Sequence, residues 1–126
     1  MVEPFPRRAT LAAAVIALVA GLLSRKLLGG ELANITGVAW WTVLVACLLL
    51  LAWPRLAPRH LFLGAATIGI AVELFQLTGV PLRLHGIHRA FALVFGTTFQ
   101  PSDLPAYVLG AAFAGAMSWL ARPRLT

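Results

Sequence analysis

The feature that most constrains this chain is a series of four apolar runs, each about as long as a helix that crosses a membrane. The runs cover roughly residues 9–23, 36–53, 61–78 and 104–120. A helix of about 18 residues extends about 27 Å, close to the hydrocarbon core of a bilayer, which is about 30 Å thick. The first run is the shortest and reaches spanning length if it extends over residues 9–28. We therefore expect an all-α membrane protein, built as a four-transmembrane-helix bundle.

The composition excludes an ordinary water-soluble domain. Hydrophobic residues make up 60% of the chain and charged residues only 11%, whereas soluble domains carry about 25% charged residues. A chain with so little charge could not cover its surface with polar groups in water. Its 126 residues suffice for one domain. Residues 1–126 are therefore predicted to form a single integral membrane domain.

Helix-breaking residues separate the four runs. They are Gly29, Gly30 and Asn34 after the first run, Pro54 and Pro58 around the second break, and Gly79 and Pro81 after the third. Proline interrupts a helix because it lacks the amide donor. Ser102 or Asp103 is expected to cap the last helix by accepting its free amide hydrogens.

The basic residues predict the orientation. Six lie on one side of the predicted membrane and four on the other: Arg7, Arg8, Arg55, Arg59, Arg122 and Arg124 against Arg25, Lys26, Arg83 and Arg89. Because cytoplasmic flanks are enriched in Lys and Arg, both termini are predicted to be cytoplasmic. No A-x-A-like cleavage site follows the first run, so we expect an uncleaved first helix. The formal charge of +6 is interpreted as flanks near anionic lipid, and no nucleic-acid partner is expected.

A segment of residues 79–102 separates the third and fourth runs, and part of it is amphipathic. Apolar residues recur there at helical spacing between polar ones: Leu84, Ile87, Phe91, Val94 and Phe95 against Arg83, His85, His88 and Arg89. This pattern predicts an amphipathic helix that lies in the outer interface between the third and fourth spans.

An acidic residue inside the third run is the strongest functional signal. Glu73 lies among apolar residues, and Gln76 follows one turn later. A carboxylate within a membrane is costly, so it usually faces the bundle interior and indicates a functional site. Two stripes of small and polar residues are predicted to pack together or to face a shared interior. The stripes are Ala65, Gly69, Glu73 and Gln76 in the third run, and Asp103, Tyr107, Gly110 and Ala114 in the fourth.

The polar ends of these stripes are expected to meet in a small chamber near the outer leaflet. The candidate ligand-binding residues are Glu73, Gln76, Arg89, Asp103, Tyr107 and Arg25. An ionised Glu73 needs a cation or several hydrogen-bond donors, and Arg89 is the first choice, with Arg25 and Lys26 as alternatives. Three interpretations stay open: a ligand-binding or proton-relay site, a buried ion pair that fixes helix register, or a protonated Glu73 that donates a hydrogen bond.

Metal and nucleophile chemistry find little support in the sequence. His85 and His88 supply two imidazoles, whereas a metal site needs three or four ligands. No phosphate-binding, dinucleotide-binding or G-x-S-x-G motif is present. We therefore expect no metal and no cofactor, assign no catalytic residue, and lean against an enzyme.

Together these residues resemble a known family, the small membrane proteins DUF2809, relatives of the VanZ-like proteins. The resemblance rests on Glu73, Gln76, Arg89, Phe99, Asp103, Leu104, Ala106, Tyr107 and Gly110, and on the segments 21–26 and 37–41. One position departs from the pattern, because Val38 stands where the family commonly has Asp. The resemblance implies an uncharacterised protein of the bacterial envelope, in the cytoplasmic (inner) membrane.

Three functions are compatible with this reading. The first is a protein that binds a lipid-linked or amphiphilic ligand in the polar chamber, with membrane lipids as its partners. The second is a membrane-embedded enzyme that acts on a lipid headgroup, with Glu73 or Asp103 as general base. The third is a small proton-coupled transporter or a transporter subunit, which would require a homo-oligomer because four short helices enclose little volume. The first is preferred, because an enzyme needs a nucleophile or metal beside its base.

Overall fold

The structure is a computed structural model that describes residues 4–91 and 100–121. These residues form five helices and no strand, which confirms the all-α prediction. The helices are α1 (Arg7–Leu27), α2 (Gly30–Ala52), α3 (Pro58–Gln76), α4 (Val80–Ile87) and α6 (Asp103–Ala121).

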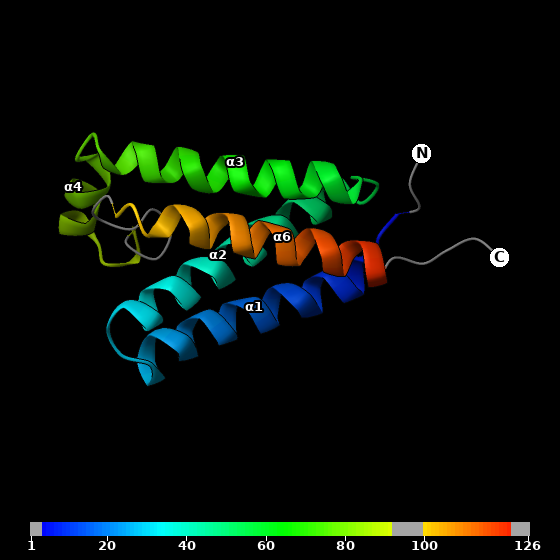
Figure 1. The fold of residues 1–126 in the computed structure, drawn as a ribbon, viewed down its shortest axis with the longest axis horizontal. Coiled ribbons are helices and arrows are strands. Elements are labelled where there is room, and N and C mark those ends of the chain that lie inside the picture. Colours follow the sequence, from blue (N-terminus) through cyan, green and yellow to red (C-terminus); the bar gives the residue numbers. More distant parts are fainter. Residues whose placement is uncertain (1–3, 92–99, 122–126) are drawn as a thin grey trace.

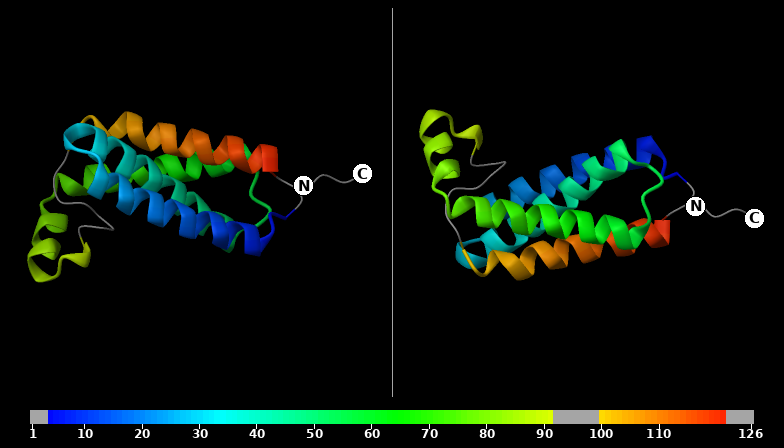
Figure 2. Two further views of the ribbon diagram at one scale, coloured as in Figure 1. Left: turned by 90° about the horizontal axis from the view of Figure 1, so that it is seen from below. Right: turned by 90° about the horizontal axis from the view of Figure 1, so that it is seen from above.

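Four of the helices lie side by side along the length of the molecule, and the short helix α4 lies across one end (Figures 1 and 2). The start of α1 and the end of α6 both lie at the opposite end. Helix α2 packs against α1, α3 and α6, whereas α1 packs against α2 alone among the described helices. The bundle is therefore organised around α2.

Proline and glycine determine two of the boundaries between helices. Pro58 occupies the first position of α3, where its missing amide hydrogen has no helical partner to lose. Beyond α3, Gly79 adopts a left-handed conformation with φ of 78°. Glycine reaches this region without steric cost, and α4 leaves α3 at an angle of 82°.

The helix that was expected over residues 36–53 begins earlier, at Gly30. Asn34 therefore lies inside α2 and does not interrupt it. An asparagine disfavours a helix mainly when its side chain competes for nearby backbone groups. Here the side-chain amide of Asn34 instead donates to Gln100 and Asp103, far along the chain. Helix α1 matches the longer of its two expected ranges.

A helix does lie in the amphipathic segment between the third and fourth runs, but α4 is shorter than the predicted helix. Helix α4 begins at Val80 and ends at Ile87, because His88 adopts an extended backbone conformation. The predicted helix was expected to continue through Val94 and Phe95, which lie outside the described residues.

The lengths and compositions of the helices indicate a membrane protein. Within the described ranges, α1, α2 and α6 are each long and apolar enough to cross a bilayer. Helices α3 and α4 qualify as a fourth span when they are taken together as one bent pair. Three or four crossings are compatible with the expected bundle.

Small residues bring α2, α3 and α6 close together. A Cβ atom at Gly110 would overlap the backbone carbonyl oxygen of Ala39, and one at Gly69 would overlap the ring of Tyr107. Ala65 and Ala111 are fully buried in the same contact region. The two stripes predicted from the sequence therefore do pack together, and their polar ends lie at one end of the bundle.

Candidate functional site

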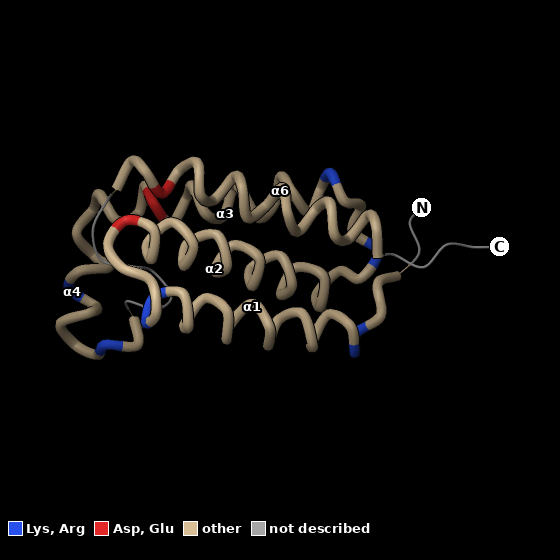
Figure 3. The backbone as a smooth tube through the Cα atoms, turned by 60° about the horizontal axis from the view of Figure 1, so that its bottom comes forward, with Lys and Arg blue, Asp and Glu red and all other residues tan. Residues whose placement is uncertain are grey.

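Acidic and basic residues divide unequally between the two ends of the bundle (Figure 3). The acidic residues of the described chain, Glu31, Glu73 and Asp103, all lie at the end that carries α4. The opposite end shows basic residues alone among the described charges. The acidic end is therefore the place to look for polar chemistry.

Glu73 lies in the last turn of α3 and is fully buried, with 0% of its surface exposed. One carboxyl oxygen, Oε1, accepts a hydrogen bond from the backbone N–H of Gln100. The other, Oε2, accepts one from the Tyr107 hydroxyl at 3.0 Å. Neutral donors from α6 and from the residues just before it thus satisfy both oxygens, as burial requires.

Asp103 opens α6 and is 6% exposed. The side-chain amide of Asn34 donates to Oδ1 of Asp103, and also to Oε1 of Gln100 at 3.0 Å. These bonds tie the first turns of α2 to the start of α6. We refer to Asn34, Glu73, Gln100, Asp103 and Tyr107 as the polar cluster.

The two acids of the polar cluster also interact with each other. The carboxyl groups of Glu73 and Asp103 act on one another electrostatically and as hydrogen-bond partners. Two carboxylates in contact repel unless one of them carries a proton. The cluster can therefore hold a proton between the two acids, and it can accept hydrogen bonds from a donor that reaches them.

Arg25 supplies positive charge beside the polar cluster. It lies in the last turn of α1, and its charge acts on both Asp103 and Tyr107. Its side chain crosses α2 at Gly37, where a Cβ atom would come within 2.6 Å of Arg25 Nε. Glycine at this position lets the guanidinium group approach the acids, while Arg25 itself remains exposed.

The expected pairing of Glu73 with Arg89 is not what the structure shows. Arg89 is exposed beyond the end of α4, and residues 4–91 and 100–121 contain no ion pair between it and Glu73. The physical reason is that Gln100 and Tyr107 already satisfy both oxygens of Glu73. The prediction that Glu73 forms a buried ion pair with Arg89 is therefore wrong in this structure, and a ligand-binding role for Arg89 stays a prediction.

Other candidate residues lie near the cluster. Gln76 is buried at the end of α3, one turn beyond Glu73. Lys26 is exposed beside Arg25. The ring of Tyr107 meets that of Trp41 edge to face, with centroids 5.8 Å apart, which fixes the hydroxyl in its direction toward Glu73.

Asn34 and Gln100 are the members of the cluster that the sequence analysis did not assign to the site. A signal was present, because the chain contains only three side-chain amides, Asn34, Gln76 and Gln100. All three lie at the acidic end. In a chain this apolar, an amide that is not needed for solubility indicates a hydrogen-bonding partner in the bundle.

Two histidines near α4 are the remaining candidates for metal ligands at this end. His85 and His88 lie on and just after α4, on the far side of the bend from Glu73. No group of three or more His, Cys, Asp or Glu side chains that could hold a metal occurs in the described part of the chain.

Comparison with known proteins relates the chain to a protein family. The model of a family described as a protein of unknown function (DUF2809) matches residues 28–111. This range includes every member of the polar cluster, whereas Arg25 and the rest of α1 up to Leu27 precede it. No curated protein and no solved structure matches the chain.

Proposed function

The chain belongs to the DUF2809 family of proteins of unknown function, and we propose that it binds the headgroup of a lipid-linked or other amphiphilic ligand at the polar cluster. The observation that carries the proposal is how the two buried acids are held. Within residues 4–91 and 100–121, their hydrogen-bond partners are neutral donors, Asn34, Gln100 and Tyr107, and not a cation fixed in an ion pair. A structural latch built as an ion pair would leave the acids no capacity to bind a ligand. Acids that are held by neutral donors keep their charge available for one.

The chemistry of the cluster suggests which headgroup it takes. Asp103 and Glu73 are acceptors, so they favour a ligand with hydroxyl or ammonium donors. Arg25 is a fixed cation, so it favours an anionic group such as a phosphate. A headgroup that combines a phosphate with hydrogen-bond donors satisfies both requirements.

The accessible edge of the cluster gives such a ligand a way in. Glu73 is fully enclosed, but Asn34 is half-buried and Gln100 and Arg25 are exposed. We assign Asp103 and Arg25 to direct contact with the headgroup. Glu73 and Tyr107 are positioning residues, because they hold the backbone at Gln100 and the start of α6 in place.

The proposal extends to location. We place the protein in the inner membrane of a bacterial envelope, with both ends of the chain in the cytoplasm and the polar cluster in the outer leaflet. The excess of basic residues on the terminal side of the sequence supports this orientation. An envelope role related to that of VanZ-like proteins is part of the proposal and rests on the resemblance alone.

The test is a competition between lipids that differ only in headgroup donors. The purified protein is equilibrated with phosphatidylethanolamine, phosphatidylglycerol and phosphatidylcholine, and retained lipid is measured by native mass spectrometry. We expect the first two to be retained over phosphatidylcholine, whose choline group has no N–H or O–H donor. Asp103→Asn should reduce that preference about tenfold, since a charge-assisted hydrogen bond contributes about 1.5–3 kcal/mol.

Matched variants separate recognition from general effects of charge. Arg25→Gln should weaken retention of all three phospholipids, whereas Lys26→Gln, its exposed neighbour, should not. Glu31→Gln is the control for Asp103→Asn, because Glu31 lies at the same end outside the polar cluster. Equal retention of the three lipids by the unmodified protein would count against the proposal.

A proton-coupled transporter is the second candidate, and the contact between the carboxyl groups of Glu73 and Asp103 favours it. In that case proteoliposomes should show a pH-driven flux that Glu73→Gln abolishes. A flux that survives this change would remove the candidate.

A further inference from the structure

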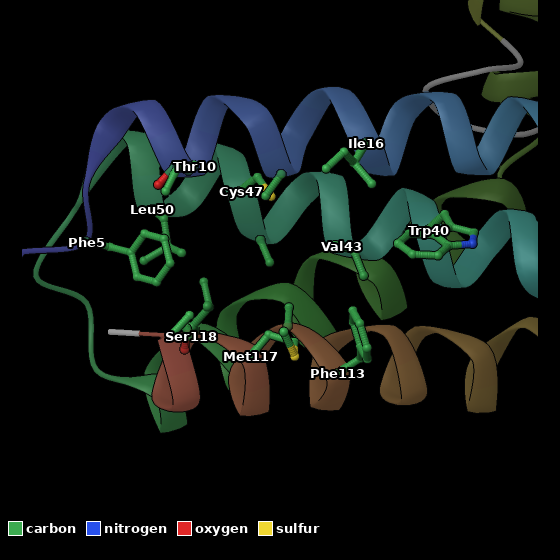
Figure 4. A pocket seen from close by; sticks show the side chains of 16 residues that line it. Phe5, Thr10, Ile16, Trp40, Val43, Cys47, Leu50, Phe113, Met117 and Ser118 are labelled. Carbon is green, nitrogen blue, oxygen red and sulfur yellow. The ribbon is translucent and has the colours of Figure 1, made fainter. Parts of the chain in front are cut away.

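An apolar groove lies between α1 and α6, along a side of α2 that the polar cluster does not use (Figure 4). Helices α1 and α6 both pack on α2, but these two described helices make no close contact with each other. A cavity of about 320 Å³ lies between them. Its walls and floor include Ala13, Ile16, Val43, Cys47, Phe113 and Met117.

The groove offers its occupant almost no hydrogen bonds. The Thr10 hydroxyl donates to the Pro6 carbonyl oxygen at 2.9 Å, and the Ser118 hydroxyl donates to that of Gly115 at 2.8 Å. Both hydroxyl hydrogens are therefore already donated to nearby backbone carbonyls. Nearly all of the remaining lining is apolar, so hydrocarbon is the chemistry that fits.

The groove leads toward the polar cluster. A second apolar cavity, of about 260 Å³, shares Trp40, Val43 and Phe113 with the groove and begins at Thr36, two residues after Asn34. The rings of Trp40 and Phe113, which line both cavities, meet edge to face with centroids 6.0 Å apart. From Leu50 to Thr36, α2 rises about 21 Å. The two neighbouring apolar cavities thus extend along that length of α2 and end beside the site proposed for the headgroup.

The size of the cavity distinguishes a single chain from a helix. A membrane helix about 10 Å wide and about 30 Å long occupies on the order of 2,000 Å³, several times the volume of the groove. A whole helix of a second copy does not fit inside the groove and could only lie across its opening, between α1 and α6. A single hydrocarbon chain is narrow enough to enter the groove and reach α2.

We propose that the groove holds a hydrocarbon chain of the same membrane lipid whose headgroup binds the polar cluster, an inference that rests on the proposed function. Lipid tails are about as apolar as the side chains that line the groove, so moving a chain from the bilayer into it adds little affinity. The headgroup therefore supplies the affinity, and the groove determines where the chain lies. Lateral entry needs no moving part, because α1 and α6 are already apart.

The test maps the position of the chain. The protein is equilibrated with phosphatidylethanolamine that carries a diazirine on one acyl chain, irradiated, and digested, and labelled residues are identified by mass spectrometry. We expect labelling of Val43 and Cys47, which are only 8% and 6% exposed and face the groove. Val15 and Val19, which are exposed on α1 and do not line the groove, report contact with bulk lipid.

Two substitutions on the same helix give a matched comparison. Ala13→Phe places a ring in the groove and should abolish labelling of Val43 and Cys47 while leaving that of Val15 and Val19. Ala12→Phe adds the same ring to an exposed position outside the groove and should change neither. Asp103→Asn should also reduce groove labelling, because the headgroup is no longer held.

The outcomes separate the two proposals. If headgroup preference depends on Asp103 but Val43 and Cys47 are never labelled, the groove inference is overturned and the proposed function stands. If groove labelling persists unchanged in Asp103→Asn, the groove takes bulk lipid and the inference is again overturned. A lipid-free dimer that protects the groove would show that a second copy covers it, and would also overturn the inference.

Discussion

Helix α2 is packed in two different ways on its two sides. Toward α3 and α6, glycine and alanine allow backbone contact, and Gly110 lies directly against the carbonyl oxygen of Ala39. Helix α1 also packs closely on α2, where a Cβ atom at Gly21 would come within 3.2 Å of Trp40 Cβ, but the groove separates α1 from α6. The side of α2 toward α3 and α6, the close side, carries the polar cluster at its end, and the side toward α1, the open side, carries the apolar groove.

This difference shows how a small bundle can hold buried acids. A carboxyl group without water needs donors at fixed positions, and only closely packed helices fix them. The family match covers the close side, α2, α3 and the first half of α6, and leaves out all of α1. We infer that α2, α3 and α6 form the frame of the site, and that α1 adds Arg25 and one wall of the groove.

The largest expected effect comes from Gly110→Ala. Its Cβ would overlap backbone, which cannot rotate away, so α2 and α6 must separate at a cost of about 3 kcal/mol. Gly21→Ala is the matched change in α1, where the new Cβ would press on Trp40 Cβ at 3.2 Å without overlapping backbone, and it should cost about 1 kcal/mol. The free energy of unfolding in mixed micelles measures both. Equal losses would contradict the difference between the two sides.

Gly69→Ala should have the next largest effect. Its Cβ would overlap the Tyr107 ring, so we expect a cost of about 2 kcal/mol together with loss of the bond from Tyr107 to Glu73. Gly86→Ala, which has open space around it in α4, serves as the control. The same unfolding measurement applies. A stability unchanged from that of the unmodified protein would show that Tyr107 has room to shift.

Tyr107→Phe removes one hydrogen bond and keeps the ring that packs on Trp41. We expect a loss of about 1–2 kcal/mol, because Oε2 of Glu73 is left buried without this donor. A double-mutant cycle with Glu73→Gln measures the coupling of the pair. Additive losses would mean that the two side chains do not act together.

The smallest effect on stability is expected from Gly37→Ala. The atoms nearest to the new methyl group all belong to the exposed side chain of Arg25, which can move away, so the free energy of unfolding should change by less than about 0.5 kcal/mol. Lipid retention should nevertheless fall, because the guanidinium group is displaced from the cluster. If retention is unchanged, Arg25 does not need its path across α2 to reach the headgroup.

The sequence predicted the helices and the convergence of polar residues because both depend on local periodicity. The apolar runs located every long helix, and the stripes through Glu73 and Asp103 identified two helix faces that do pack together. The start of α2 was missed because Asn34 looks like a helix breaker until its distant partners are known.

The partners of Glu73 could not be predicted for a related reason. Charge alone favoured Arg89, but one of the donors is the backbone N–H of Gln100, which no side-chain pattern reveals. The role of Gly37 was equally hidden, since a glycine that makes room for Arg25 has no signature in composition or spacing. The partners of Glu73 and the role of Gly37 both depend on contacts between residues that are far apart in the sequence.

The most direct test of the central claim is whether the buried acids respond to a headgroup. A difference infrared spectrum is recorded as phosphatidylethanolamine is added to the protein in phosphatidylcholine micelles. We predict a change in the carboxyl bands that is lost in Asp103→Asn and kept in Glu31→Gln. A spectrum without such a change, or a change that persists in Asp103→Asn, would contradict the assignment of the polar cluster as the headgroup site.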